Sequence, residues 1–251
     1  MSGDPTIRVI SLQHSDRRPA VAGQLRALRR SWAFFDAIDH VGPAGLHYDP
    51  GVARRRFGRE LGAAELGIFA SHIALWRQAA AADHGSIWLI LEDDVTFEPH
   101  FATLLDEIVA RMRDRRIDFL RLFAITEGPR VQEARFASFD LYRYIGDCWG
   151  TQAYLLTPAG AHRLLAAICR VERPIDNELD RYWHHGLPDR VTIPLMVRHN
   201  LVPSTAEAER ATMERDRQAN RQWRRWLYYR SRAVMGWHGS LTRIALALGR
   251  R

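Results

Sequence analysis

Lysine is absent from this chain of 251 residues, and all 36 of its basic residues are arginine. It has only two cysteines, Cys148 and Cys169, which are too few for a disulfide framework and lack metal-ligand spacing. We expect both to be ordinary thiols in a reducing cytosol. No stretch approaches the roughly 18 uninterrupted apolar residues that a membrane-spanning helix needs. Internal repeats and low-complexity tracts are also missing.

The first residues lack the basic segment and long apolar stretch of a secretory signal, so we expect a cytosolic protein that can still lie against a membrane. The formal net charge is +7, which favours anionic partners such as phosphate groups, acidic lipid or nucleic acid. Hydrophobic residues make up 47% of the chain. That is enough for the core of one large domain, or of one domain plus an appendage.

Short apolar runs alternate along the chain with segments of helical periodicity. Residues 87–91 (IWLIL) are continuously apolar, as expected for a central strand covered on both faces. Residues 41–62, rich in glycine and proline, are interpreted as a loop or a poorly regular excursion. Further strands are predicted at 7–12, 32–38, 119–123, 139–144, 152–156 and 191–194, and helices at 17–30, 63–82, 101–112, 158–169 and 176–184. This alternation predicts an α/β fold with a parallel or mixed sheet and helices on both sides.

The segment LILEDDV, residues 89–95, places three adjacent carboxylates, Glu92, Asp93 and Asp94, at the end of that apolar strand. Ligands of open α/β sheets bind beyond the carboxyl ends of the strands. Like charges in such a cluster repel one another unless a cation or hydrogen bonds compensate them. Mg²⁺ and Mn²⁺ prefer oxygen ligands, commonly one or two carboxylates plus substrate phosphates. The cluster therefore predicts a site for a metal-bound nucleoside diphosphate, whose departure in a sugar transfer needs a Lewis acid.

Alternation along a strand predicts that Glu92 and Asp94 share one face, whereas Asp93 points away. We assign Asp94 to the metal, Glu92 to the metal or the nucleotide, and Asp93 to the nucleotide-binding residues. The alternative, a solvated acidic turn after a core strand, stays open at this point.

Five segments, in order along the chain, resemble glycosyltransferase family 25, the lipooligosaccharide galactosyltransferase family that also includes collagen galactosyltransferase domains. They are RVISLQHSDRR at 8–18, LGAAELGIFASHIALW at 61–76, LILEDDV at 89–95, CWGTQAYLLTPAGAHRLL at 148–165 and RPIDNEL at 173–179. One departure is Phe69, where many members of the family carry cysteine. It affects packing more than chemistry.

The resemblance covers residues 6–204 and implies a GT-A-like fold, a single α/β domain around a mixed, mostly parallel sheet. It further implies a UDP-sugar donor, most often UDP-galactose, a Mn²⁺ or Mg²⁺ ion, and inversion at the anomeric carbon. We therefore expect a hexosyltransferase that acts on a hydroxyl of a bacterial surface glycan similar to lipooligosaccharide or lipopolysaccharide, including lipid-linked acceptors.

Three residues that follow the first strand, Asp16, Arg17 and Arg18, approach the nucleotide by this resemblance. The planar, permanently charged fork of arginine suits a diphosphate. Alternatively, these residues begin a solvated helix with Asp16 as its N-cap.

The helix at 63–82 carries Glu65, Ser71 and His72, which by the resemblance form a wall of the donor pocket, with His72 near the phosphates or the acceptor. Glu65 and His72 lie seven residues apart and hence on one inward-directed face. Buried Glu and His side chains need partners, so the alternative is a satisfied polar pair that locks the helix.

An inverting transferase needs a base that deprotonates the acceptor hydroxyl, and we assign this role to Asp176. Asp176 can instead cap a helix, or bind the metal or the acceptor. Gly150, Thr151 and Tyr154 belong by the resemblance to the donor site, where Gly150 allows backbone to approach the sugar closely. His199, after a late strand, is a candidate further metal ligand, although a lone histidine is more often structural.

Residues 205–251 form a basic, aromatic-rich tail that we expect to be helical. Residues 215–232 alone hold seven arginines, two tryptophans and two tyrosines. Such a helix suits an anionic inner-membrane surface first, packing on the domain with snorkelling arginines second, and single-stranded nucleic acid last. The chief alternative to an enzyme is a non-catalytic cation-binding module whose tail docks on a membrane or on nucleic acid.

Overall fold

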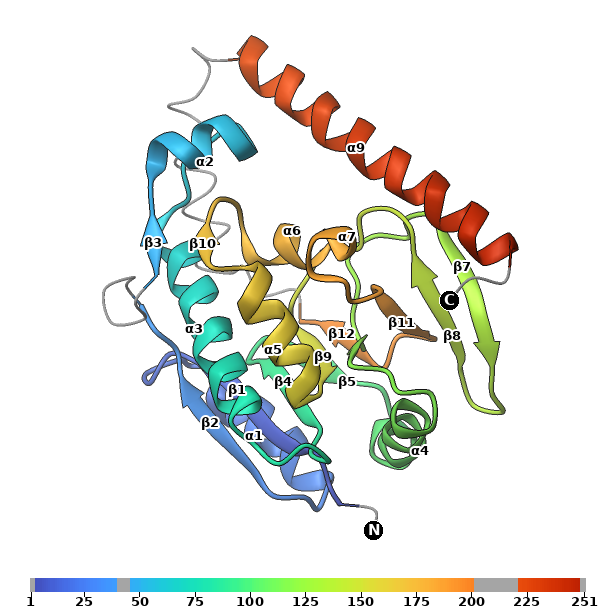
Figure 1. Cartoon of the computed structure of the whole chain (residues 1–251). Coiled ribbons are helices and arrows are strands. Elements are labelled where there is room, and N and C mark those ends of the chain that lie inside the picture. The colour runs from blue at the N-terminus through green and yellow to red at the C-terminus, as the bar shows by residue number, and fades with distance from the viewer. Residues whose placement is uncertain (1–2, 40–45, 201–220, 249–251) are drawn as a thin grey trace.

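The computed structural model describes residues 3–39, 46–200 and 221–248 (Figure 1). Its centre is an eight-stranded sheet in the order β2-β1-β4-β9-β6-β11-β8-β7. These strands are β1 (Thr6–Ser11), β2 (Trp32–Asp36), β4 (Trp88–Glu92), β6 (Phe119–Arg121), β7 (Arg130–Arg135), β8 (Asp140–Tyr144), β9 (Ala153–Leu156) and β11 (Arg190–Ile193). Two small sheets join β3 (His47–Tyr48) to β10 (Arg170–Val171), and β5 (Val95–Phe97) to β12 (Val197–His199).

Helices cover both faces of the large sheet, which confirms the predicted α/β architecture. One face packs against α1 (Arg18–Ala27) and α4 (Phe101–Asp114), and the other against α3 (Ala63–Ala80) and α5 (Pro158–Ala167). The remaining helices in the described ranges are α2 (Pro50–Phe57), α6 (Ile175–Leu179), α7 (Tyr182–His185) and α9 (Arg221–Ala247). The single helix predicted over 176–184 is thus two short helices, α6 and α7.

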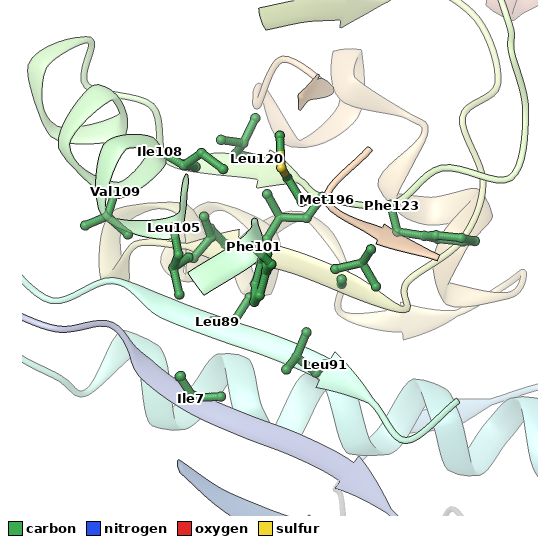
Figure 2. Close-up of a cluster of buried hydrophobic side chains, with 14 of the residues drawn as sticks. Ile7, Leu89, Leu91, Phe101, Leu105, Ile108, Val109, Leu120, Phe123 and Met196 are labelled. Atoms are coloured by element: carbon green, nitrogen blue, oxygen red, sulfur yellow. The ribbon is translucent and has the colours of Figure 1, made fainter. Parts of the chain in front are cut away.

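Strand β4 lies inside the sheet, and its side chains alternate between the two cores. Leu89 and Leu91 belong to the core under α1 and α4, whereas Trp88 and Ile90 belong to the core under α3 and α5. Figure 2 shows the first core, in which Leu89 lies next to Phe101 of α4 and Leu91 lies further along β4. Each such buried side chain stabilises the fold by about 1.5–3 kcal/mol. Burial on both faces is the reason for the continuous apolar run, as predicted.

The sheet is mixed, but the expectation that it is mostly parallel is wrong. β1 pairs in parallel with β2 and β4, and β6 with β11, whereas β9 is antiparallel to β4 and β6, and β8 is antiparallel to β7 and β11. Residues 145–152 bring the chain to the edge at which β4 ends, where Leu91 pairs with Ala153. The next strand, β9, therefore has to run back from that edge and opposes both of its neighbours.

The interpretation of residues 41–62 as an irregular excursion is also wrong for the part that the structure describes. β3 and α2 lie within it. The Asp49 side chain accepts hydrogen bonds from the N–H groups of Gly51 and Val52, and Pro50 stands in the first turn of α2. An aspartate N-cap followed by proline is a favourable helix start. Glycine and proline here therefore mark helix ends, not a loop.

Helix α9 runs from α2 past α7 towards β7 and β8 (Figure 1). Met235 is buried, so the helix packs on the domain, as the second interpretation of the tail predicts. The predicted boundary at residues 204 and 205 falls outside the described residues, as do the side chains of Trp223, Leu227, Tyr228 and Tyr229. Across the described ranges, every helix is too short or too polar to cross a bilayer.

Candidate functional site

The acidic cluster lies where neighbouring strands of the sheet end. β1 ends at Ser11 and β4 at Glu92, and the two strands are parallel neighbours. The loop before β9 reaches the same edge, because the Glu92 N–H donates to the Gln152 carbonyl at 2.9 Å. Three distant parts of the sequence therefore meet at one edge, the position at which α/β sheets bind ligands.

Asp93 is held by a set of hydrogen bonds from the segment that follows β1. Its Oδ2 accepts from the hydroxyls of Ser11 at 2.6 Å and Ser15 at 2.7 Å, and its Oδ1 lies 3.1 Å from Arg17 Nε. The prediction that Asp93 points away from its neighbours is wrong, because β4 ends at Glu92 and residues 93–94 form a turn. Asp93 is 8% exposed and Asp94 4%, which excludes a solvated acidic turn.

Asp94 differs from its neighbours in the cluster in the partners of its two carboxylate oxygens. Its Oδ2 lies 3.1 Å from His199 Nε2 and 3.7 Å from Arg17 Nη1. Its Oδ1 is buried and accepts no hydrogen bond from the part of the chain that the structure describes. Burial, with the charge of Glu92, raises the pKa of Asp94 to about 6. A buried carboxylate oxygen without a partner is unfavourable unless a ligand meets it.

Glu92 is linked by polar contacts to His72 and Trp76 of α3 through the residues that surround it. The Thr151 hydroxyl donates to Glu92 Oε1, and His72 Nε2 lies 3.6 Å from the same oxygen. His72 Nδ1 lies 2.8 Å from the Tyr154 hydroxyl, which accepts from Trp76 Nε1 at 2.8 Å. We assign the Tyr154 hydroxyl as the hydrogen-bond donor to His72 Nδ1. The imidazole proton is then on Nε2, where it faces Glu92. Burial acts to raise the pKa of Glu92, but His72 and Thr151 outweigh it and lower that pKa.

Two cavities meet at the cluster. The Ser11 pocket, about 290 Å³, lies between β1, the segment after β2, and α3. The Gly150 pocket, about 390 Å³, lies between α6, β12 and the segments after β6 and β8. Ile68, Glu92 and Asp94 line both, so the two pockets share one wall.

Arg121, 1% exposed at the end of β6, holds the backbone that lines the Gly150 pocket. Its Nη1 donates to the Gly150 carbonyl, its Nε to Asp189 Oδ1 at 2.7 Å, and its Nη2 to Asp180 Oδ1 at 2.9 Å. Asp180 also accepts from the Trp149 N–H at 3.2 Å. Trp149 and Gly150 have φ values of 54° and 90°, a left-handed pair that needs such support.

Comparison with known proteins gives this arrangement a family. Residues 4–179 match the sequence model of glycosyltransferase family 25, described as an LPS biosynthesis protein. The chain belongs to glycosyltransferase family 25. The five segments that carried the resemblance all lie within the matched residues, and the match ends with α6.

Three curated relatives represent this family. Inactive glycosyltransferase 25 family member 3 of Homo sapiens is 29% identical over 175 residues, which are 66% of this chain and 29% of that protein. Procollagen galactosyltransferase 1 of Danio rerio is 24% identical over 177 residues, 66% of this chain and 29% of the relative. Procollagen galactosyltransferase 1-A of Xenopus laevis is 26% identical over 198 residues, 72% and 31% respectively. The chain spans less than a third of the length of each of these relatives, and one of the three names describes its protein as inactive.

Most of the residues that the family resemblance indicated come together at the two pockets. The Ser11 pocket holds Arg17, Ser71, His72 and Asp93, the Gly150 pocket holds Glu65, Gly150, Thr151, Asp176 and His199, and Glu92 and Asp94 line both.

Three other predicted residues lie outside the pocket linings. Asp16 is exposed, and Arg17 rather than Asp16 stands at the N-cap of α1, so that alternative is wrong. Arg18 donates to the Ser11 carbonyl at 2.9 Å and pairs with Asp36, which ties β1 to β2. Tyr154 is 1% exposed and lies beneath the site, where it supports His72.

Glu65 and Ser71 line the pockets while they also hold the backbone. Glu65 pairs with both Nη atoms of Arg59, so the hypothesis of a Glu65–His72 pair is wrong. The Ser71 hydroxyl accepts from the Ile38 N–H at 2.9 Å, which fixes the segment after β2 against α3.

Asp176 faces the same cavity as Asp94 and His199. It is not the N-cap of α6, since Pro174 takes that position, and its Oδ1 accepts from the Asn177 N–H at 2.8 Å. Among the described residues, no group of three or more His, Cys, Asp or Glu side chains is arranged to hold a metal. Asp94 and His199 are the residues there that could hold an ion, if its remaining ligands came from a diphosphate.

Sequence reasoning missed the residues that position the site. Ser11 and Ser15 bind Asp93, and Arg121 with Asp180 and Asp189 holds the loop before β9. A signal for Arg121 was present, because an arginine inside the apolar run FLRLF has to be paired when that strand is buried.

Proposed function

We propose that this member of glycosyltransferase family 25 is a metal-dependent, inverting hexosyltransferase with a GT-A-like fold. It moves a hexose, with galactose the first candidate, from a UDP-sugar to a hydroxyl of a bacterial surface glycan. The observation that carries the proposal is the shared wall of the two pockets: Glu92 and Asp94 line both, and the buried Oδ1 of Asp94 accepts no hydrogen bond from the described residues. The galactosyltransferase names of two relatives support the choice of sugar.

The Ser11 pocket suits the nucleotide part of the donor. Its wall combines the apolar residues Ile10, Leu12 and Ile38 with Ser11 and Asp39, a mixture that suits a nucleoside. Arg17 lies at the junction with the acidic cluster and brings a permanent positive charge to the place where a diphosphate would lie.

The residues at the shared wall fit a Mn²⁺ or Mg²⁺ ion. Asp94 and His199 would hold it, and such an ion supplies Lewis-acid stabilisation of a departing diphosphate. Glu92 stays ionised because His72 and Thr151 lower its pKa, so it adds a fixed negative charge beside the ion. Burial of the cluster strengthens these interactions by excluding water.

The Gly150 pocket suits the sugar and the acceptor. Gly150 presents bare backbone there, and Thr151 and Glu92 offer hydrogen-bonding groups to sugar hydroxyls. Asp176 reaches the pocket from α6 and is the candidate base for the acceptor hydroxyl. An in-line displacement needs this base on the side of the sugar opposite the leaving diphosphate.

A second candidate is a non-catalytic module that binds a cation and carries out no transfer. It is favoured by the relatives whose names call them inactive. The two candidates differ in one observable, turnover of a UDP-sugar.

The first test is calorimetric titration of UDP, with GDP as control, with and without Mn²⁺, on wild type and Asp94→Asn. We expect Mn²⁺-dependent UDP binding that weakens at least about tenfold in the variant, because a neutral amide replaces the Asp94 carboxylate that the proposal assigns to the ion. Asp83→Asn removes an exposed carboxylate before β4, at the opposite end of the strand, and should bind like wild type.

Release of UDP from UDP-galactose is then followed with and without acceptor glycan. Turnover that depends on Asp176 supports the transferase. Absence of nucleotide binding in folded protein with Mn²⁺ present, or UDP binding without turnover of any UDP-hexose, refutes the transferase and supports the non-catalytic module.

A further inference from the structure

Helix α9 has an apolar face that the described part of the domain does not cover. Its side chains are exposed by between 39% and 65% and recur at helical spacing: Trp226, Val234, Trp237, Leu241, Ile244 and Leu248. Residues three and four apart lie on one side of a helix, so these side chains form one stripe. Exposed apolar stripes of this kind mark interaction surfaces.

The opposite side of α9 is fixed to the domain. The His238 ring stacks on Trp183 with 4.6 Å between centroids, and the Thr242 hydroxyl donates to the Tyr182 hydroxyl at 3.3 Å. A Cβ on Gly239 would lie 2.4 Å from the Ile145 carbonyl oxygen, so only glycine fits there. These contacts set the rotation of α9 and leave its apolar stripe facing away from the domain.

An arginine pocket of about 210 Å³ adjoins this stripe, between α2, α6, α7 and the first half of α9. Its basic lining consists of Arg55, Arg56, Arg173, Arg181 and Arg230. Val234 lines the pocket and also belongs to the stripe, so the charged and apolar surfaces are continuous.

The lining of this pocket holds five arginines and two aspartates. Two carboxylates outside the lining also pair with these arginines, and the first, Glu172 Oε2, lies 3.7 Å from Arg56 Nε. The second, Glu178, is shared, at 3.2 Å from Arg173 Nε and 2.7 Å from Arg181 Nη1. Of the two aspartates in the lining, Asp147 and Asp180, the second is already bound by Arg121. Burial lowers the pKa of Arg173, and the charge of Arg181 adds to that lowering. A bound anion would relieve this excess.

We infer that the arginine pocket and the apolar stripe of α9 together dock on an anionic phospholipid bilayer, with a headgroup phosphate in the pocket and the stripe among the upper acyl chains. Amphipathic helices with tryptophan on the apolar face and arginine beside it bind anionic interfaces in this way. A second copy of the chain is disfavoured, because a symmetric contact would bring the same arginines together.

This inference goes beyond the proposed transfer reaction. Helix α6 lies between the Gly150 pocket and the arginine pocket, since Asp176 lines the first and Asn177 lines the second. A bilayer on the α9 side would therefore hold a membrane-borne acceptor within reach of the Gly150 pocket.

The test is co-sedimentation of the full chain with vesicles of phosphatidylcholine alone or of equimolar phosphatidylcholine and phosphatidylglycerol. Neither donor nor acceptor is present, so the result does not depend on transfer activity. Wild type should bind the anionic vesicles at least about tenfold more tightly than the neutral ones. Tryptophan emission should shift to the blue on binding, because Trp226 and Trp237 leave water.

Two double variants separate the two parts of the surface. Trp237→Ser with Ile244→Ser should weaken anionic-vesicle binding at least about tenfold by removing exposed apolar groups, without harm to the fold. Arg55→Gln with Arg230→Gln should weaken it about thirtyfold. The control, Arg26→Gln with Arg163→Gln on α1 and α5, removes the same net charge from exposed positions and should change binding by less than about threefold.

Three results would overturn the inference. The first is equal binding to neutral and anionic vesicles, and the second is equal loss in the pocket and control variants. The third is a dimer in light scattering that Trp237→Ser with Ile244→Ser converts to a monomer, which would assign the stripe to a second copy of the chain.

Discussion

Replacement of Arg121 by methionine should lower the stability of this protein more than any single surface substitution. Methionine fills a similar volume but leaves the Asp180 and Asp189 carboxylates, 1% and 0% exposed, without their cation. Removal of one partner from a buried ion pair destabilises proteins by about 3–5 kcal/mol. We expect a loss of about 4 kcal/mol near pH 7.5, measured by urea unfolding with the emission of the eight tryptophans.

The loss at Arg121 should also depend on pH, with a definite sign. Burial raises the pKa of Asp180 and of Asp189, and Arg121 opposes that rise. Without the arginine, both folded-state pKa values move further above those of the unfolded chain. The folded variant then binds more protons than the unfolded one, so its stability increases as pH falls. Arg121→Met should therefore lose less at pH 5.5 than at pH 7.5.

Two further variants check this reasoning. Arg121→Met combined with Asp180→Asn and Asp189→Asn removes the charges together and should recover at least half of the loss. Arg121→Lys keeps the charge but cannot reach the Gly150 carbonyl and two carboxylates at once. Its stability should therefore lie between those of wild type and Arg121→Met. A loss below about 1 kcal/mol, or a loss that is the same at both pH values, would refute the account of this buried network.

Three other substitutions test separate features. Burial lowers the pKa of His185 to about 4, so the contribution of His185 to stability should fall by about 2 kcal/mol from pH 7 to pH 5, as the unfolded chain takes up the proton first. The difference in urea midpoint between wild type and His185→Asn should change by that amount over this range. Gly150→Ala places a Cβ 2.7 Å from a side-chain oxygen at a residue with φ 90°, and should lower the stability of the fold by roughly 2–4 kcal/mol. Its control, Gly186→Ala, lies in open space at φ 71° and should lower the stability by only about 1 kcal/mol. Equal losses in thermal melts would contradict the steric argument. Thr151→Val removes the hydroxyl on Glu92 and should lose about 1 kcal/mol in urea, while Thr151→Ser should stay near wild type; the reverse order would rule out that hydrogen bond.

The sequence predicted the features that depend on local pattern. The apolar run before Glu92 predicted a strand buried on both faces, and the carboxylates at its end predicted the edge at which the pockets meet. Helix α3 was likewise predicted from its apolar periodicity. In each case the signal and the structure lie within one segment of the chain.

Features that depend on distant partners were missed. The partners of Arg121 lie 59 and 68 residues away, so no local pattern pairs them. The antiparallel direction of β9 follows from the path of the preceding loop, which periodicity does not encode. The direction of the Asp93 side chain was predicted wrongly because the prediction extended strand alternation to Asp94, whereas β4 ends at Glu92 and a turn begins at Asp93.

The wall shared by the Ser11 and Gly150 pockets makes the two cavities thermodynamically dependent. Glu92 and Asp94 face both, so a ligand that changes the charge or position of either carboxylate on one side alters affinity on the other. Coupling of this kind is reciprocal: each ligand changes the affinity of the other by the same factor. For the proposed transfer, the donor and the acceptor would therefore bind interdependently, through one pair of side chains.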